Sequence, residues 1–335
     1  MTTKPFSAAW ELTRKCNGLC IYCGSNAREK LEDELTLEDA MSLIEKFSKL
    51  EIKVINILGG EIFLRKDWFA ILKKIKDKGM DIFLITNGTL LNQEIINKLK
   101  IIDPLNISVS LDGNEKYHNR VRKGAKFEIV LKNIDLLLKE GFNVSVITTI
   151  IKQNYSYDSL EELYKIICSR KLFSWRIQVG YFEGRMKKEF LLEPKQIYNL
   201  CKWISKKNKP KFVISVGDSL GYFSKADKKL RLNKWFGCTA GLTHFSISYN
   251  GNIKGCLALP DEHIEGNIKK NDLIKIWESK NHFGYNRDFN LNLLKGKCKS
   301  CKYNQQCRGG CKAFNSCNGD IFENKCCNLI IENGK

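Results

Sequence analysis

Three cysteines stand close together near the start of the sequence, and no fourth follows for a long stretch. Cys16, Cys20 and Cys23 are separated by three and then two residues, and the next cysteine is Cys168. A structural zinc site takes four ligands, and no nearby histidine or cysteine completes this one. A [4Fe–4S] cluster held by three thiolates keeps one iron open. The triplet therefore predicts a cluster whose open iron binds a substrate or a cofactor.

A second group of cysteines occupies the C-terminal part of the chain. A zinc ribbon would need two C-x2-C pairs there, and only one is present, Cys298 with Cys301. The chain has 335 residues and its first residues lack the apolar segment of an export signal, so metal ligation in a reducing cytoplasm is favoured over a disulfide framework. The group comprises Cys238, Cys256, Cys298, Cys301, Cys307, Cys311, Cys317, Cys326 and Cys327.

Alternating strand and helix patterns in the first half must position the triplet. Apolar runs predict strands at 8–13, 53–58, 81–86, 106–111, 143–150 and 175–180. Helical periodicity predicts helices between them, at 35–50, 67–79, 92–100, 127–141 and 158–170. Such alternation favours a parallel sheet whose carboxyl-end loops form the active-site edge. Cys168 and Cys201 fall in apolar helical contexts, and we expect both to be buried thiols.

Polar motifs recur where the predicted strands end. His118 and Arg122 follow the fourth strand, and Gln178 lies in the sixth. Taken singly, these motifs are also explained as ordinary turns or solvated charges. In this order, at one edge of a sheet and behind a cysteine triplet, they predict one shared site. The motifs that directly follow the second, third and fourth strands are Gly59-Gly60-Glu61, Thr86-Asn87-Gly88 and Ser110-Leu111-Asp112-Gly113.

Residues 7 to 185 resemble the radical SAM enzyme family in these motifs. The resemblance implies that the open iron chelates S-adenosylmethionine, and that an electron from the cluster cleaves this cofactor to a 5′-deoxyadenosyl radical. Ile62 replaces the common Pro after the GGE motif, and Asn119 replaces the usual Asp of the His118–Arg122 loop. Arg185 is a weaker candidate, and no catalytic acid or base is assigned. The implied cofactor-binding residues are Tyr22, Gly59, Gly60, Glu61, Asn87, Ser110, Asp112, Arg122 and Gln178.

The C-terminal cysteines resemble the SPASM extension of that family, which carries two auxiliary iron–sulfur clusters. A hairpin expected across Asn250-Gly251 and a helix entry at 266–277 agree with this resemblance. The implied ligands of the nearer cluster are Cys238, Cys256 and Cys311, with either Cys317 or an open iron as the fourth position. The implied ligands of the farther cluster are Cys298, Cys301, Cys307 and a late cysteine, for which Cys327 is favoured over Cys326.

The expected fold is α/β, a partial (β/α)6 TIM-like barrel followed by a small cysteine-rich α+β SPASM domain. We expect the barrel at 1–190, a bridging region at 191–235 and the SPASM domain at 236–335. No apolar run is long enough to span a bilayer, so the protein is expected to be cytoplasmic, without a membrane partner. The net charge of +19 suggests nucleic acid, but the lysines are scattered over predicted helices without the interleaved aromatics that stack bases.

The expected function is maturation of a ribosomally synthesised peptide, by hydrogen abstraction and formation of a carbon–carbon or thioether cross-link with auxiliary-cluster participation. Expected partners are the precursor peptide and an electron donor such as flavodoxin or ferredoxin. The first strand begins near residue 7, which leaves no N-terminal recognition domain, so a separate recognition protein is a further candidate. The alternatives are a haem-precursor decarboxylase, an alcohol dehydrogenase, a sulfatase-maturase-like oxidase and, from another class, an iron–sulfur nucleic-acid-binding protein.

Overall fold

An open sheet of ten strands forms the centre of the structure, a computed structural model that describes residues 4–29, 31–207, 212–231 and 234–334. The strand order is β12-β11-β10-β1-β3-β4-β5-β7-β8-β9, and β9 and β12 do not pair with each other, so the barrel is not closed. All neighbouring strands from β10 to β9 are parallel. The fold class is therefore the expected partial barrel.

The six strands predicted for the barrel all form, each within a residue or two of its predicted bounds. Their inward and outward side chains alternate because the strand repeat is two residues. The outward side chains pack into the main core, in which Trp10, Phe47 and Trp175 are fully buried. The strands are β1 (Ser7–Glu11), β3 (Val54–Leu58), β4 (Asp81–Thr86), β5 (Asn106–Ser110), β7 (Val144–Ile150) and β8 (Ser174–Val179).

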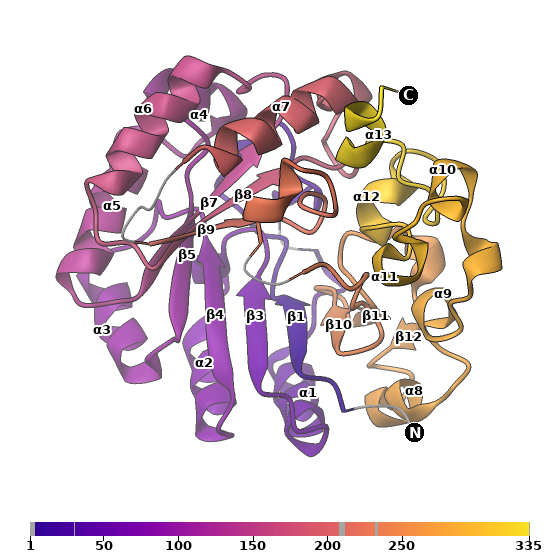
Figure 1. The fold of residues 1–335 in the computed structure, drawn as a ribbon. Helices are drawn as coiled ribbons and strands as arrows, with labels where there is room; N and C mark the ends of the chain where they lie inside the picture. The colour runs from indigo at the N-terminus through magenta and orange to yellow at the C-terminus, as the bar shows by residue number, and fades with distance from the viewer. Residues whose placement is uncertain (1–3, 30, 208–211, 232–233, 335) are drawn as a thin grey trace.

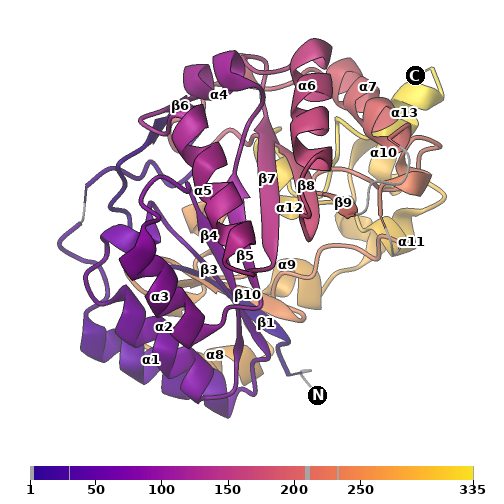
Figure 2. The same ribbon diagram turned by 90° about the vertical axis from the view of Figure 1, so that its left-hand side faces the viewer.

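Helices cover the outer face of this sheet (Figures 1 and 2). α1 begins in a capping box between Thr36 and Asp39, and α2 and α5 end at Gly79 and Gly141, whose positive φ angles of 75° and 86° suit glycine. α4 was not expected from the sequence. The helices are α1 (Leu37–Lys49), α2 (Trp68–Asp77), α3 (Gln93–Ile102), α4 (Glu115–Val121), α5 (Phe127–Lys139), α6 (Tyr157–Cys168) and α7 (Pro194–Ser205).

The two helical cysteines differ in their surroundings. Cys201 is fully buried, as expected, but Cys168 is exposed, so the prediction of a buried thiol at Cys168 is wrong. The buried face of α6 runs through Leu160, Leu163 and Ile167. The next residue along the helix is turned about 100° away from that face, because a turn takes about 3.6 residues.

The sheet continues across both predicted domain boundaries, which stay predictions. β9 (Val213–Val216) adds to β8, and β10 (His244–Ile247) pairs in parallel with β1. β10 forms the expected hairpin with β11 (Asn252–Lys254) across Asn250-Gly251, and β12 (Gly266–Asn267) follows. A short pair, β2 (Leu19–Cys20) with β6 (Arg122–Lys123), lies outside the main sheet.

The cysteine-rich C-terminal region is built from short helices beside β1 and β10 (Figure 1). Its last helix returns to the barrel, where the Tyr198 hydroxyl of α7 donates to Glu332 Oε1 at 3.3 Å. In the part of the chain that the structure describes, none of the helices has the length and apolar character needed to cross a membrane. The short helices are α8 (Leu273–Glu278), α9 (Gly284–Arg287), α10 (Gly296–Lys299), α11 (Asn304–Cys307), α12 (Lys312–Ser316) and α13 (Asn328–Glu332).

Candidate functional site

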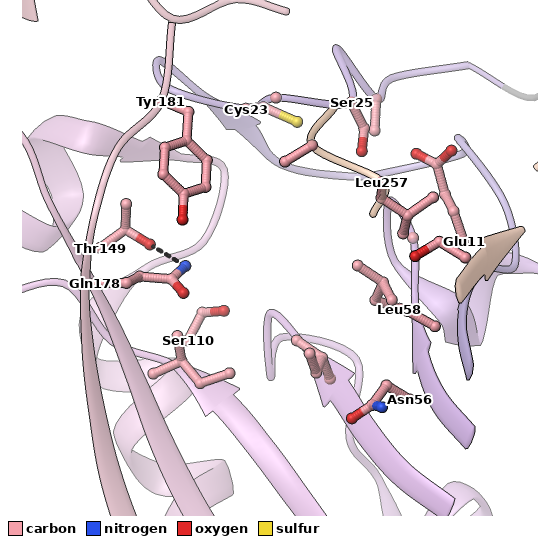
Figure 3. Close-up of a pocket in the computed structure, with 18 of the residues that line it drawn as sticks. Glu11, Cys23, Ser25, Asn56, Leu58, Ser110, Thr149, Gln178, Tyr181 and Leu257 are labelled. Carbon is pink, nitrogen blue, oxygen red and sulfur yellow. Dashed lines mark hydrogen bonds between the residues drawn. The ribbon is translucent and has the colours of Figure 1, made fainter. Parts of the chain in front are cut away.

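A large cavity opens at the carboxyl ends of the parallel strands, where the sequence motifs meet. Its volume is about 1220 Å³, and its wall includes all three cysteines of the N-terminal triplet. Figure 3 shows Cys23 and Tyr181 at its rim, with Ser110, Thr149 and Gln178 together on one side. Of the predicted cofactor-binding residues, Tyr22, Gly59, Gly60, Asn87, Ser110, Arg122 and Gln178 line the cavity.

The triplet cysteines are gathered around Gly18 in the loop after β1. The Gly18 amide donates to Cys16 Sγ at 3.3 Å, and a Cβ on Gly18 would lie 3.6 Å from that sulfur and 3.8 Å from Cys20 Sγ. Burial, with the charges of Glu61, Cys20 and Cys23, raises the pKa of the Cys16 thiol to about 11, although the Gly18 hydrogen bond acts to lower it. The free Cys16 thiol is therefore protonated at neutral pH, and iron must displace this proton when it binds.

Arg185, in the segment after β8, hydrogen-bonds to this cysteine loop. Its backbone amide donates to Cys23 O at 2.9 Å, and its guanidinium donates to Cys20 O at 3.1 Å and to Ala27 O at 3.0 Å. Gly184 lets the two segments approach, because a Cβ there would lie 2.2 Å from Gly24 O. Arg185 is a weaker candidate from the sequence alone. In the structure, its hydrogen bonds stabilise the cysteine loop.

Glu61 is buried and turned toward the TNG motif rather than into the cavity. Its carboxylate accepts hydrogen bonds from Thr86 Oγ1 at 2.8 and 3.0 Å and from the Asn87 amide at 2.8 Å. Burial raises its pKa to about 7. The backbone of Gly59 and Gly60, not this carboxylate, faces the cavity. Glu61 therefore joins the loops after β3 and β4 and holds both in place.

Asp112, Arg122 and Tyr22 form a buried polar cluster beside Cys20. Arg122 Nη1 donates to the Tyr22 hydroxyl at 2.7 Å and to Asp112 Oδ2 at 3.1 Å, and the Tyr22 hydroxyl also donates to Asp112 Oδ2. The other Asp112 oxygen accepts from the Thr149 amide at 2.7 Å. Arg122 Nε is buried without a partner among the described residues. This cluster leaves a guanidinium donor free for a ligand carboxylate.

His118 supports this cluster as a neutral imidazole. The Asp112 amide donates to His118 Nδ1 at 3.2 Å, so the proton resides on Nε2, which donates to Ala125 O at 2.8 Å. Burial lowers its pKa to about 4. Asn119, which replaces the usual Asp, accepts from the Phe127 amide at 2.8 Å at the start of α5. The substitution therefore keeps a local acceptor in this loop.

The C-terminal cysteines fall into two groups, which we call the near group (Cys238, Cys256, Cys311) and the far group (Cys298, Cys301, Cys307, Cys327). Burial and the charges of Cys238 and Cys256 raise the pKa of Cys311, and burial with the charges of the other three far-group thiols raises that of Cys307. Backbone amides donate to two far-group sulfurs, from Asn324 to Cys298 at 3.3 Å and from Tyr303 to Cys301 at 3.5 Å. Thiols within each predicted ligand set thus act on one another, and the ligand assignments stay predictions.

Cys317 and Cys326 lie apart, on the wall of a separate small cavity. Cys317 Sγ contacts Phe182 O and Ala313 O, both at 3.5 Å. The fourth position of the near group and the preference for Cys327 over Cys326 stay predictions. No three His, Cys, Asp or Glu side chains of the described ranges converge on a point that would suit a single metal ion. A cubane cluster is a larger unit, in which each thiolate binds a different iron.

Several residues at the cavity have no motif that could reveal them. Thr149 donates its amide to Asp112 and accepts from Gln178 Nε2 at 3.1 Å through its hydroxyl. Arg176, Tyr181 and Glu183 also line the wall. Arg176 lies two residues before Gln178 on the sixth predicted strand. Because side chains alternate along a strand, this spacing places both on the same face and could have indicated Arg176.

Comparison with known proteins adds two family matches and several full-length relatives. The model of the Radical SAM superfamily matches residues 10–167, and that of the SPASM iron–sulfur cluster-binding domain matches residues 238–312. The AdoMet-dependent heme synthase of Methanosarcina barkeri is 30% identical to this chain, and the match covers 96% of each of the two proteins. Mycofactocin maturase MftC of Mycolicibacterium smegmatis is 25% identical, over 92% of this chain and 78% of its own.

Among solved structures, the fold is similar to that of Streptococcus suis SuiB bound to the precursor peptide SuiA. The TM-score is 0.76 at 19% identity, and the match covers 96% of this chain and 76% of that chain. This likeness concerns the fold, including the open barrel and the C-terminal cysteine-rich region.

Proposed function

This chain belongs to the radical SAM superfamily and carries a SPASM domain, and from that premise we propose that it modifies a peptide by radical chemistry. Its cofactors are S-adenosylmethionine and [4Fe–4S] clusters. When bound, they supply a 5′-deoxyadenosyl radical that abstracts hydrogen from the substrate. The residues present fit these groups, because three thiols and an unpaired guanidinium nitrogen meet at one cavity.

Different residues of the chain hold the cluster and the parts of S-adenosylmethionine. Cys16, Cys20 and Cys23 hold the cluster, and Arg185 holds their loop in shape. The backbone of Gly59 and Gly60 takes the amino group of S-adenosylmethionine, with Glu61 fixing that backbone. Arg122 takes its carboxylate, with Asp112 paired to Arg122 from behind, and Asn87, Ser110, Gln178 and Tyr22 complete the pocket. The near and far groups would hold the auxiliary clusters, which would supply a site for the electron that a two-electron oxidation leaves behind.

The polar cavity wall is the observation that favours a peptide over a macrocycle. Many inward positions of the strands carry hydroxyl or amide side chains, which can hydrogen-bond to peptide N–H and C=O groups. A porphyrin presents two apolar faces and offers such a wall fewer hydrogen bonds than a peptide does. Several of the wall's side chains also pair with one another, as Ser145 does with Ser174 and Gln178 with Thr149. These positions include Ser7, Asn56, Asn106, Ser108, Ser110, Ser145, Thr149, Ser174, Gln178, Ser215 and Ser246.

Two charged residues in this wall are available to a substrate. No described residue forms an ion pair or hydrogen bond with the Arg176 side chain, whose planar guanidinium suits a carboxylate. The Glu183 carboxylate also lacks a hydrogen-bond partner in the described part of the chain; it lies beside Gly24, 3.6 Å from where a Cβ would stand. We therefore expect a peptide that presents a carboxylate to Arg176 and an N–H or cationic group to Glu183.

A second candidate, chemistry on a haem precursor, rests on one observation. The heme synthase of Methanosarcina barkeri is 30% identical across nearly the full length of both chains, whereas the mycofactocin maturase is 25% identical. The propionate carboxylates of such a substrate would also suit Arg176.

One experiment separates the two candidates. The anaerobically reconstituted protein is supplied with S-adenosylmethionine, a strong reductant and either a short peptide encoded beside its gene or iron-coproporphyrin III. We expect 5′-deoxyadenosine together with a peptide that has lost two hydrogen atoms, as a cross-link requires. Loss of carbon dioxide from the porphyrin, with the peptide unchanged, would refute the peptide proposal. Changing the triplet cysteines together to Ala is expected to abolish 5′-deoxyadenosine in either case.

A further inference from the structure

A lysine is buried completely within the cysteine-rich region. Lys312 is the first residue of α12, directly after Cys311, and its exposed fraction is 0%. Its Nζ donates to Arg308 O at 2.9 Å. The same atom lies 4.0 Å from the ring centroid of Phe322 and 5.4 Å from that of Phe289. The ammonium group thus has one carbonyl partner and two aromatic faces around it.

No carboxylate of the described residues forms an ion pair with this ammonium group. The carboxylate of Asp320 acts on the pKa of Lys312 through its charge, but it is ion-paired with Lys295 instead. It also accepts a hydrogen bond from the Phe322 amide at 2.8 Å. A cation taken out of water without an anion is strongly unfavourable. A negative charge close to Lys312 would therefore stabilise its protonated form.

Lys312 is tied to both C-terminal cysteine groups. It directly follows Cys311 of the near group, and its Nζ bonds to the carbonyl of Arg308, the residue after Cys307 of the far group. Burial lowers the pKa of Lys312, whereas the charges of Cys238, Cys307 and Cys298 raise it and favour its protonated form. Cysteine ligands of an iron–sulfur cluster are thiolates, and the clusters they hold carry net negative charge. Lys312 is thus attached to both predicted ligand sets, and no carboxylate of the described ranges forms an ion pair with it.

We propose that Lys312 is a fixed positive charge shared by the two auxiliary clusters, which raises the reduction potentials of both. Each cluster gains one electron on reduction, and a neighbouring cation in a region of low dielectric constant stabilises the added negative charge. A cluster of higher potential is the better acceptor for an electron leaving the substrate. That last consequence rests on the proposed function, but the effect on the potentials does not.

The test is a potentiometric titration of the fully reconstituted enzyme, followed by electron paramagnetic resonance and without any substrate. Lys312→Met removes the charge and keeps an unbranched side chain, and Lys312→Arg keeps the charge. Lys302→Met is the matched control, because Lys302 follows Cys301 directly but is exposed, with its Nζ 5.1 Å from the Tyr303 ring. Iron content and circular dichroism are measured on every variant.

We expect Lys312→Met to lower both auxiliary potentials by at least a tenfold change in the reduction equilibrium, which is about 59 mV for one electron. Lys312→Arg and Lys302→Met should stay near the parental values. Loss of auxiliary iron in Lys312→Met but not in Lys312→Arg would also support the proposal, because Lys312→Arg keeps the positive charge that Lys312→Met removes. Unchanged potentials at full iron content, an equal shift in Lys302→Met, or equal iron loss in both Lys312 variants would overturn it.

Discussion

Replacing Arg122 by Met tests the buried cluster that is proposed to hold the cofactor. The change removes two hydrogen bonds, at 2.7 Å to the Tyr22 hydroxyl and at 3.1 Å to Asp112 Oδ2. Asp112 is 0% exposed, so its carboxyl group would be left buried without a counter-ion. Breaking a buried pair in this way costs about 3–5 kcal/mol. The Thr149 amide and the Tyr22 hydroxyl still donate to Asp112, so we expect the lower end, about 3 kcal/mol.

A double-mutant cycle isolates the charge from the loss of packing. In Arg122→Met with Asp112→Asn, neither partner carries a charge, so the pair of changes should destabilise less than the sum of the single changes by about 2 kcal/mol or more. The control is Lys98→Met, which breaks the exposed pair with Glu94 at 2.7 Å and should cost about 0.5 kcal/mol or less.

The assay is anaerobic guanidinium unfolding followed by tryptophan fluorescence, with S-adenosylmethionine binding measured on the same samples. We expect binding to fall in Arg122→Met and to stay low in the double variant, because the carboxylate partner is still missing. Strictly additive free energies in the cycle would refute the buried ion pair. Parental binding affinity in Arg122→Met would refute the placement of the cofactor carboxylate.

Three further predictions concern other parts of the site. Glu61→Ala removes the acceptor for the Asn87 amide and should weaken S-adenosylmethionine binding about tenfold or more, by titration, since a hydrogen bond to a charged group is worth about 1.5–3 kcal/mol; unchanged affinity would contradict its role. Cys327→Ala should lose about four irons and Cys326→Ala none, by iron analysis; the reverse would exchange their roles. Burial lowers the pKa of His118 to about 4, so its neutral form stabilises the folded protein fully above pH 6.5. This stabilisation is lost as the pH falls toward 4. The unfolding midpoint should therefore change less with pH over this range in His118→Gln than in the parent protein.

Local patterns in the sequence were sufficient for the barrel elements. Alternating apolar residues placed β4 at its observed bounds, and the glycines after α2 and α5 marked where these helices end. The fold class and the family resemblance are confirmed by the structure and by the family matches. These features depend on neighbouring residues, whose periodicity and turn chemistry the sequence displays directly.

What the sequence could not show depends on contacts between distant residues. The solvent exposure of Cys168 depends on which face of α6 meets the sheet. The hydrogen bonds of Arg185 to the cysteine loop join residues 165 positions apart, and no local pattern indicates them. The burial of Lys312 is likewise invisible in the sequence, where a lysine predicts a solvated side chain.

The parallel pairing of β1 with β10 has a consequence for how the chain folds during synthesis. Ser7 Oγ lies 2.9 Å from His244 Nδ1, and the two residues are 237 positions apart. A ribosome releases the N-terminal end first, so β1 leaves it with one hydrogen-bonding edge open until β10 follows. Open strand edges invite pairing with other chains, and contacts of such sequence separation form slowly. The nascent barrel, together with the cysteine loop that follows β1, thus stays aggregation-prone until most of the protein has been translated.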